Sequence, residues 1–266
     1  EDCDEDGDVT SVATIAAEQM STLDFVARAP GVIAGMPVAA AVFAILGGSS
    51  MSISTVIKDG ESVHAGTVLG SAVGSTRLLL QGERTALNLL SHLSAIATAT
   101  RAWAEALGDS TTKVRDTRKT TPGMRTLEKY AVRCGGGLNH RMNLSDAALI
   151  KDNHVVAAGG VARAYELIKQ RYPDLSVEVE VDSLDQLAEA LEVGADLVLL
   201  DNFTIEELNS AVDFTRGRAK LEASGGFTFD QAKAVASTGV DFVAVGAITH
   251  SAPVLDIGAD LRMESI

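Results

Sequence analysis

A repeat of short strand-like segments, each followed by a helical segment, constrains the fold of the second half of the chain more than any other feature. Four strand-like segments begin 20 to 23 residues apart, at 177–181, 197–201, 220–224 and 242–246. After each of the first three, a Ser or Thr is followed three residues later by Gln or Glu, the capping-box pattern of a helix start. Together with similar segments at 113–118 and 147–151, the repeat predicts an α/β fold, an open parallel, TIM-like barrel of about six strands.

The first part of the chain predicts a small α+β domain. Short segments separated by turn residues are expected to form strands at 11–14, 21–28, 31–34, 52–57 and 67–71. Residues 36–46 have the composition of a helix. The longest helix is predicted over 83–107, where apolar residues recur at spacings of three and four until Gly108. A helix of that length, roughly 38 Å, is long enough to connect two domains.

Positive charge is concentrated between residues 113 and 141, in a chain whose formal net charge is −14. This segment contains eight Lys or Arg residues and only two acidic residues, Asp116 and Glu128, so its local charge is about +6. An acidic protein with its cations in one segment is expected to bind a small, highly charged anion there. The alternative is a solvated charged helix face, which accounts for Glu128, Lys129 and nearby arginines but poorly for the charged strand before them. That strand must end in a polar cavity or in water.

Polar residues follow the predicted barrel strands, where parallel barrels carry their chemistry. These candidates are Arg118, Lys119, His140, Arg141, Lys151, Glu180, Asp201, Ser224, Gly225, Gly226, Gly246 and His250. Strand alternation turns Glu178 and Glu180 into the barrel, and Glu222 likewise. Buried carboxylates require cations, for which Lys151, Arg118 and a bound metal ion are the candidates.

Two carboxylates at neighbouring strand ends, Glu180 and Asp201, suit Mg²⁺, which takes oxygen ligands and keeps several waters. The structural alternative is a salt bridge from these carboxylates to Lys151 or Lys220. The glycine-rich turns 224–226 and 246 can present backbone N–H groups to phosphate oxygens. The sequence therefore predicts a site for magnesium and phosphate groups at these strand ends.

The bulk composition argues against several classes of partner. The strongly acidic balance disfavours nucleic acid. The longest apolar run, 32–46, is too short and too rich in Ala and Gly to span a bilayer, so no membrane association is expected. Two cysteines offer no disulfide framework, which favours a cytoplasmic location. Residues 1–8 carry six carboxylates on a segment expected to be exposed, and the natural start is expected upstream because the chain does not begin with Met.

Six motifs occur in a fixed order along the chain. They are 116–123 (DTRKTTPG), 135–141 (GGGLNHR), 149–154 (LIKDNH), 179–181 (VEV), 200–202 (LDN) and 222–226 (EASGG). This series closely resembles the quinolinate phosphoribosyltransferase family, the carboxylating nicotinate-nucleotide pyrophosphorylases of NAD biosynthesis. The likeness extends over nearly the whole chain, including 8–10 and 82–88.

The resemblance implies an N-terminal domain over residues 1–91, a barrel domain over 92–251 and a segment, 252–266, that packs back on the first domain. It implies a reaction in which quinolinate and 5-phosphoribosyl 1-pyrophosphate give nicotinate mononucleotide, pyrophosphate and CO₂, with Mg²⁺. It also implies a homodimer or higher homo-oligomer with shared active sites.

The resemblance further assigns roles to the candidate residues. Quinolinate carboxylates would be held by Arg118, His140, Arg141 and Lys151, and by Arg84 of a neighbouring subunit. Phosphate or pyrophosphate would be held by Lys119, Ser224, Gly225, Gly226, Gly246 and His250. Glu180 and Asp201 would face the ribose and the metal, the metal through water, and together with Lys151 they are the predicted catalytic residues.

Two other functions remain open at this point. One is a phosphoribosyltransferase for a related pyridine acid such as nicotinate, without decarboxylation, although the number of cations favours a dicarboxylate. The other is a Schiff-base aldolase that uses Lys151, because a lysine at a barrel strand end suits that chemistry.

Overall fold

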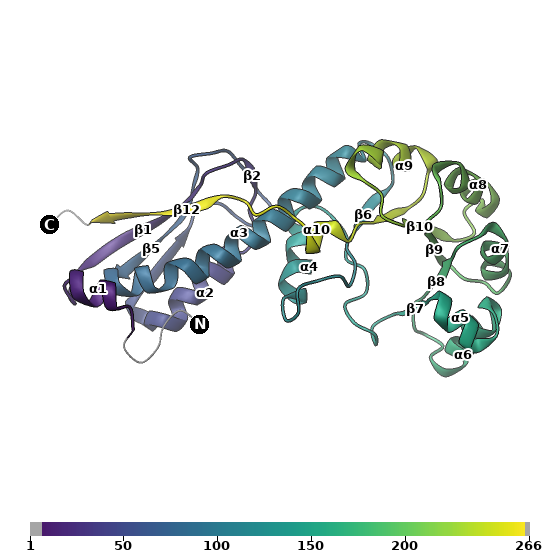
Figure 1. The fold of residues 1–266 in the computed structure, drawn as a ribbon, viewed down its shortest axis with the longest axis horizontal. Coiled ribbons are helices and arrows are strands. Elements are labelled where there is room, and N and C mark those ends of the chain that lie inside the picture. Colours follow the sequence, from purple (N-terminus) through teal and green to yellow (C-terminus); the bar gives the residue numbers. More distant parts are fainter. Residues whose placement is uncertain (1–6, 264–266) are drawn as a thin grey trace. The chain divides into compact units, whose positions relative to one another are not determined.

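The structure is a computed structural model that describes residues 7–263, and it divides into two compact units (Figure 1). The first comprises Glu1–Ala99, Arg133–Gly136 and Ala252–Ile266, and the second Thr100–Val132 and Gly137–Ser251. The predicted boundary at 91 and 92 and the observed boundary after Ala99 both fall within one long helix, α3 (Thr76–Ala106). Most of the acidic segment expected to be exposed lies outside the described residues.

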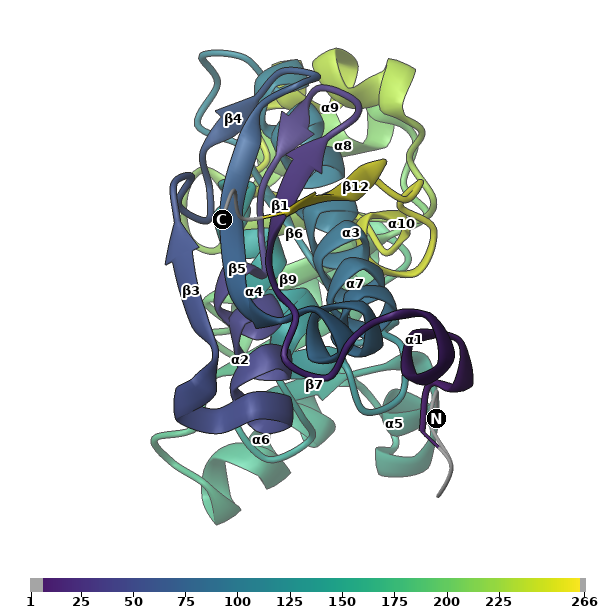
Figure 2. The same ribbon diagram turned by 90° about the vertical axis from the view of Figure 1, so that its left-hand side faces the viewer.

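The first unit is built on a four-stranded antiparallel sheet in the order β12-β1-β5-β3 (Figure 2). Its strands are β1 (Met20–Ala27), β3 (Ser52–Thr55), β5 (Val68–Ser75) and β12 (Ile257–Met263). The short strands β2 (Gly31–Val32) and β4 (Ser62–Val63) pair separately. The remaining elements are α1 (Val9–Thr14), α2 (Met36–Gly47) and η1 (Gly48–Ser50), besides α3.

Apolar side chains from the sheet and from α2 and α3 form the core of the first unit. Leu23 and Phe25 of β1 meet Phe43 of α2 and Leu79 and Leu90 of α3, all of them fully or almost fully buried. The rings of Phe25 and Phe43 are tilted against each other with centroids 5.9 Å apart. The helix predicted over 36–46 is present as α2, because its apolar side chains pack into this core.

Two predictions for the first unit are wrong. The expected strand at 11–14 is part of helix α1, because the Asp8 carboxylate accepts hydrogen bonds from the Thr10 and Ser11 amides and caps a helix start. The long helix begins at Thr76 instead of residue 83, since Gly82 does not interrupt it. Arg84 consequently lies in the third turn of α3 rather than at its start.

The second unit is a six-stranded, wholly parallel sheet in the order β6-β11-β10-β9-β8-β7, which confirms the predicted open α/β barrel. Its strands are β6 (Lys113–Arg115), β7 (Ala148–Ile150), β8 (Val177–Val181), β9 (Leu197–Asp201), β10 (Lys220–Ser224) and β11 (Phe242–Ala244). The strands β6 and β7 form the two edges, so the barrel is open between them.

Helices cover the outside of this sheet, as Figure 1 shows for α6 to α9. The helices of the unit are α4 (Arg125–Cys134), α5 (Asp152–Ala158), α6 (Val161–Arg171), α7 (Leu184–Glu192), α8 (Ile205–Thr215), η2 (Phe229–Gln231), α9 (Ala232–Thr238) and α10 (Ala247–His250). The capping box at α8 is formed as predicted: Thr204 and Glu207 exchange side-chain to backbone hydrogen bonds of 2.8 and 3.2 Å. Within residues 7–263 no helix combines the length and apolarity needed to cross a membrane.

Gly82 allows α2 and α3 to pack closely. A Cβ atom built there would lie 2.8 Å from both Phe43 Cε1 and Leu46 Cδ1. We expect Gly82→Ala to lower the free energy of unfolding by about 1 kcal/mol, because an overpacking cost of about 1–3 kcal/mol exceeds the gain of about 1 kcal/mol in helix propensity. Urea denaturation measures the difference. Asn88→Ala, an exposed site on the same helix, is the control and should be neutral or slightly stabilising; a stabilising Gly82→Ala would contradict the packing argument.

Candidate active site

A cavity of about 390 Å³ opens at the carboxyl ends of the barrel strands. Eight of the predicted site residues line it: Arg118, Lys119, His140, Arg141, Lys151, Glu180, Asp201 and Ser224. Thr117, Leu149, Leu199, Glu222 and Ala244 complete the lining. Parallel strands end at the same side of a sheet, which is why residues from β7, β8, β9 and β10 meet here.

The other predicted site residues occupy three further places. Gly246 and His250 adjoin Lys119, since a Cβ atom at Gly246 would lie 3.1 Å from Lys119 Cδ and 3.3 Å from His250 Nε2. Gly225 and Gly226 line a neighbouring hollow at the starts of α8 and η2. Arg84 belongs to the first unit, where its side chain is exposed and forms no ion pair with any described residue.

Gly225 is required by the backbone geometry beside the cavity. Its φ of +123° is strained for any residue with a side chain, and a Cβ atom there would lie 2.6 Å from Asn202 Cα. Asn202 itself has a left-handed φ of 59°, and its amide donates a 3.0 Å hydrogen bond to the carbonyl of Ser224. The ends of β9 and β10 are thereby held together next to Asp201.

Two arginines that line the cavity each have a buried donor without a partner. The Nε atoms of Arg118 and Arg141 are buried, and neither has a hydrogen-bond partner among the described residues. Burial lowers the pKa of Arg141, and the nearby charge of Arg118 lowers it further. A buried charged donor without an acceptor costs more than about 1–3 kcal/mol, so the pair is suited to an anionic ligand.

A fully buried ion pair supports the residues on one side of the cavity. Lys129 Nζ of α4 pairs with the Asp116 carboxylate at the end of β6, and both side chains are inaccessible to solvent. Asp116 also accepts hydrogen bonds from Asn139 Nδ2 at 2.6 Å and from the His140 amide at 2.8 Å. Burial lowers the pKa of Lys129, against the opposing effect of Asp116.

The interpretation of α4 as a solvated charged face is therefore wrong for Glu128 and Lys129, which are both fully buried. Arg125, at the start of the helix, donates to Arg118 O at 3.3 Å and to Met142 O at 3.0 Å. It thereby ties together the two loops that carry Arg118 and Arg141.

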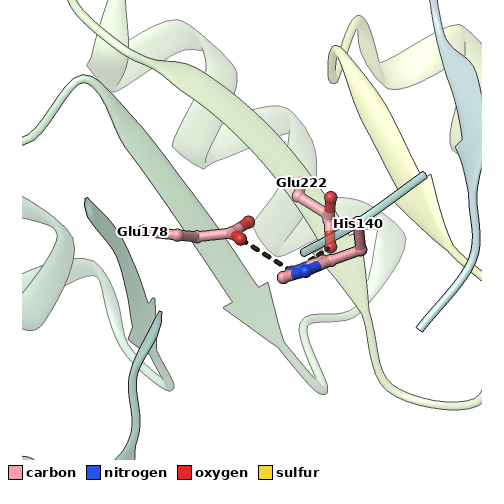
Figure 3. A group of neighbouring side chains, drawn as sticks. All are labelled: His140, Glu178 and Glu222. Carbon is pink, nitrogen blue, oxygen red and sulfur yellow. Dashed lines mark ion pairs between the residues drawn. The ribbon is translucent and has the colours of Figure 1, made fainter. Parts of the chain in front are cut away.

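A second cluster in the barrel contains the buried residues Glu178, Glu222 and His140, which Figure 3 shows, together with Arg115. His140 Nε2 lies 2.8 Å from Glu178 Oε2 and 3.7 Å from Glu222 Oε1. Arg115 pairs with Glu222, and its Nη1 lies 3.7 Å from Glu178 Oε1. The expectation that Lys151 or Arg118 balances these two glutamates is wrong, because the cation next to them is Arg115, two residues before Thr117 of the cavity lining.

This cluster includes the donors of a candidate metal site within the described residues, namely His140, Glu178 and Glu222. The Arg141 amide donates a 2.7 Å hydrogen bond to His140 Nδ1, so the ring proton resides on Nε2. Nε2 is then a donor to Glu178 and offers no lone pair to a metal ion. The cluster is a hydrogen-bonded ion-pair network, and it does not include the carboxylates predicted to bind Mg²⁺.

Those two carboxylates lie at the cavity. Glu180 forms an ion pair with Lys151, which is the salt bridge considered as the structural alternative. Asp201 accepts a 2.7 Å hydrogen bond from Asn202 Nδ2. Lys220, the other cation considered, pairs instead with Asp241, 2.6 Å away.

The fold and the site define a class of protein. A parallel α/β barrel whose strand ends combine Arg, Lys and carboxylate groups around one cavity is an enzyme scaffold for multiply charged anionic substrates. Comparison with known families identifies the group. Residues 8–94 match "Quinolinate phosphoribosyl transferase, N-terminal domain", and residues 96–260 match the C-terminal domain of the same description. The chain belongs to the quinolinate phosphoribosyltransferase family.

Individual relatives agree with this assignment. The chain is 47% identical over 96% of its length to the nicotinate-nucleotide pyrophosphorylase [carboxylating] of Mycobacterium leprae, covering 91% of that protein. It is 41% identical to the probable enzyme of the same name from Bacillus subtilis, over 97% of this chain and 89% of the relative. The solved nicotinate-nucleotide pyrophosphorylase from Francisella tularensis has 39% identity and a TM-score of 0.93, with 97% of this chain and 91% of that chain covered.

Sequence reasoning left out several residues that hold the site together. Arg115, Asp116 and Lys129 lie within the cationic segment, but a count of charges does not show which of them pair below the cavity. Strand alternation predicts that Glu178 and Glu222 face inward, but the candidate cations, Lys151 and Arg118, did not include Arg115. Finding this partner required the strand order.

We expect the cluster to make stability depend on pH through Glu222. The pKa of Glu222 is raised from 4.5 to about 8, mainly by burial and also by the charge of Glu178, while Arg115 opposes both. A raised folded-state pKa contributes stability below about pH 4.5, and this contribution is lost as the pH rises through about 8. Glu222→Gln lacks this dependence, so its melting temperature relative to the wild type should increase steadily from pH 5 to pH 8.

Differential scanning calorimetry in matched buffers measures this difference. Glu192→Gln, at an exposed position of α7, should follow the wild type at every pH. A constant difference between Glu222→Gln and the wild type over this range would show that Glu222 is ionised throughout.

Proposed function

We propose that the protein transfers a phosphoribosyl group from 5-phosphoribosyl 1-pyrophosphate to quinolinate and releases pyrophosphate, CO₂ and nicotinate mononucleotide, as a step of NAD biosynthesis. One observation carries the choice of substrate. Arg118 and Arg141 both hold a buried, unpartnered Nε–H beside the same cavity as Lys151. Two guanidinium groups and an ammonium group match the two carboxylates of a pyridine dicarboxylate.

Phosphate groups of the ribosyl donor are proposed to bind on the other side of the cavity. Ser224 and Lys119 line the cavity there, and Lys119 is held by Thr249, whose hydroxyl donates to the Lys119 carbonyl at 2.8 Å. His250 and the bare backbones at Gly225, Gly226 and Gly246 adjoin these side chains. Backbone N–H groups at such turns suit phosphate oxygens.

The chemistry that this arrangement supports needs no nucleophilic side chain. Attack by the pyridine nitrogen on the anomeric carbon, with loss of pyrophosphate, passes through an oxocarbenium-like state that gains from the carboxylates of Glu180 and Asp201. Lys119 would stabilise the leaving pyrophosphate. The ribosylated nitrogen carries positive charge, which stabilises the carbanion left when the adjacent carboxylate departs as CO₂, and this carbon then takes up a proton from water. The protein contributes positioning and electrostatic stabilisation.

Magnesium is proposed as the metal ion, held through water by Glu180 and Asp201. The donor set fits this ion, because two carboxylates on adjacent strands leave room for several retained waters. The ion would neutralise pyrophosphate charge. Lys151 pairs with Glu180 and moderates the charge of the carboxylate.

The proposed assembly is a homo-oligomer, at least a dimer, in which Arg84 of one subunit completes the site of another. Within the described residues Arg84 forms no ion pair with an acidic residue. Neither nucleic acid nor membrane enters this proposal. The cytoplasmic location expected from the cysteine content stays a prediction.

Two alternative functions, a nicotinate phosphoribosyltransferase and a Schiff-base aldolase, can be tested on the same protein. A nicotinate phosphoribosyltransferase would use one carboxylate and release no CO₂. A Schiff-base aldolase requires Lys151 as a free amine, whereas its ammonium group pairs with Glu180. Borohydride with a carbonyl substrate would trap an adduct only for the aldolase.

The deciding experiment supplies quinolinate or nicotinate with the ribosyl donor and Mg²⁺. We expect mononucleotide and CO₂ in equal amounts from quinolinate, and neither product in quantity from nicotinate. Mononucleotide from nicotinate at a comparable rate would favour the alternative transferase. Mass spectrometry of the nucleotide and headspace measurement of CO₂ provide the two readouts.

Glu180→Gln and Asp201→Asn should lower kcat about tenfold or more, the equivalent of about 1.4 kcal/mol of lost transition-state stabilisation. Each should also raise the Mg²⁺ concentration for half-maximal rate, because each removes negative charge at the proposed metal position. Steady-state rates over a Mg²⁺ series measure both effects. Asp182→Asn, exposed just beyond β8, is the matched control. Wild-type turnover at every Mg²⁺ concentration would leave only the salt-bridge interpretation.

Mixed dimers test the shared site. Arg84→Ala and Lys151→Ala should each be inactive, yet subunit exchange between them should restore activity, because one site of each mixed dimer then carries neither lesion. Exchange is followed by native mass spectrometry after mild denaturation and refolding. Exchanged but inactive dimers would mean that each site is built within one chain, and a fully active Arg84→Ala would remove Arg84 from the site.

A further inference from the structure

The loops that follow the neighbouring strands β6 and β11 are joined by one side-chain hydrogen bond. The backbone contacts of these strands end where the Val245 amide donates to the Arg115 carbonyl at 2.9 Å. Further along both segments, the Thr249 hydroxyl of α10 donates to the Lys119 carbonyl at 2.8 Å. No other hydrogen bond joins 116–121 to 246–251 in the part of the chain that the structure describes. The position of Lys119 relative to α10 therefore depends on Thr249.

The Thr249 hydroxyl has one proton and two acceptors within reach. Its Oγ1 lies 2.8 Å from the Lys119 carbonyl oxygen and 3.1 Å from the Gly246 carbonyl oxygen. The Gly246 carbonyl already accepts from the amides of Thr249 and His250, at 3.1 and 3.2 Å. The proton is therefore assigned to the shorter contact, with Lys119. Only 2% of Thr249 is exposed, so solvent does not compete for this bond.

Lys119 is the cation that this bond holds in place. Its side chain is exposed and forms no ion pair with a described residue, so its ammonium group is available to an anion. A Cβ atom at Gly246 would lie 3.1 Å from Lys119 Cδ and 3.3 Å from His250 Nε2, so both side chains lie against the bare Gly246 backbone. A lysine has many rotamers, and holding its backbone and its stem reduces the freedom that ligand binding must remove.

The carbonyl group one residue earlier is held by a different side chain. Arg125 Nη2 donates to the Arg118 carbonyl at 3.3 Å, and Arg125 Nε donates to Thr120 Oγ1 at 3.0 Å. Loss of the Thr249 hydroxyl would therefore release the Lys119 carbonyl while Arg118 stays anchored. The two consecutive cations of this loop are positioned independently.

We propose that Thr249 is a positioning residue for the ribosyl donor, whose hydroxyl fixes Lys119 against Gly246 so that the ammonium group meets the leaving pyrophosphate. This inference rests on the proposed function for the identity of that ligand. It assigns Thr249 an effect on the donor and none on quinolinate, because Arg118 has its own anchor.

Substrate-specific kinetics test this assignment. Thr249→Val replaces the hydroxyl by a methyl group of nearly equal size. We expect kcat/KM for the ribosyl donor to fall about tenfold, while the Kd of quinolinate changes less than about twofold. Thr249→Ser keeps the hydroxyl and should stay within about twofold of the wild type for both substrates. If Thr249→Val does not fold, Thr249→Ala removes the same hydroxyl and takes its place.

Three kinetic outcomes would overturn the proposal. They are wild-type donor kinetics in Thr249→Val, equal losses for both substrates, and a serine variant as impaired as the valine variant.

Thr112→Val is the matched control. Thr112 is also 2% exposed, and its hydroxyl donates to the Val240 carbonyl at 2.7 Å just before β6 and β11 begin. The control thus removes the same kind of bond between the same two strands at their amino ends. Its melting temperature should fall, but the kinetics of both substrates should stay unchanged. A donor-specific loss in Thr112→Val as well would reveal a general loosening of the two strands and contradict the proposal.

Calorimetric titration with inorganic pyrophosphate and Mg²⁺ tests whether Thr249 acts through Lys119. We expect Thr249→Val to weaken pyrophosphate binding about tenfold in the otherwise unchanged protein. In the Lys119→Ala background the same substitution should cost less than about twofold, because the group that it positions is gone. Equal weakening in both backgrounds would show that the hydroxyl acts on another group and would refute the proposal.

The titration also separates this inference from the proposed function. A wild-type protein that binds neither pyrophosphate nor the ribosyl donor would refute the proposed function and this inference with it. Equal binding by the wild type and Thr249→Val would refute the inference alone.

Discussion

The site depends on one buried ion pair, Asp116 with Lys129. The pair joins three segments that are separate in sequence: the end of β6, helix α4 and the turn at 139–140. Two charges inaccessible to water are stable only when hydrogen bonds satisfy their remaining atoms, as they do here. Removing one partner of such a pair typically costs about 3–5 kcal/mol, because the other is left as an isolated buried charge. The position of each guanidinium group at the cavity follows from this anchor.

Charge is arranged in layers below the cavity. Arg115, Glu178 and Glu222 are mutually paired in the barrel interior, and Lys151 and Glu180 pair nearer to solvent. Arg118 and Arg141, which line the cavity, each keep a buried Nε donor without a partner among the described residues. An acidic protein can thus hold a strongly cationic site, since its many surface carboxylates lie elsewhere and the inner ones are already neutralised.

The barrel and the composition of the cavity could be predicted from the sequence, because strand spacing, capping boxes and alternation are local signals. Eight of the residues predicted at the strand ends do line one cavity. The pairing below it could not be predicted, since Arg115 meets Glu222 only once β11 lies between β6 and β10 in the sheet. The helix at Val9–Thr14 was missed because a single Asp8 cap outweighs the composition of the segment. The start of α3 at Thr76 was missed because the prediction placed the helix start at residue 83 and did not include Gly82.

The pairing of β12 with β1 has a consequence for how the chain is made. Ser21 lies opposite Met263, so the central strand of the first sheet acquires one of its neighbours only after residues 257–263 have been synthesised. Until then β1 presents an open edge while the entire barrel is synthesised. Nascent chains of this protein therefore pass through a long interval, the synthesis of the barrel, in which the first unit is exposed to strand exchange with other copies. Chaperone protection during synthesis would act on that edge.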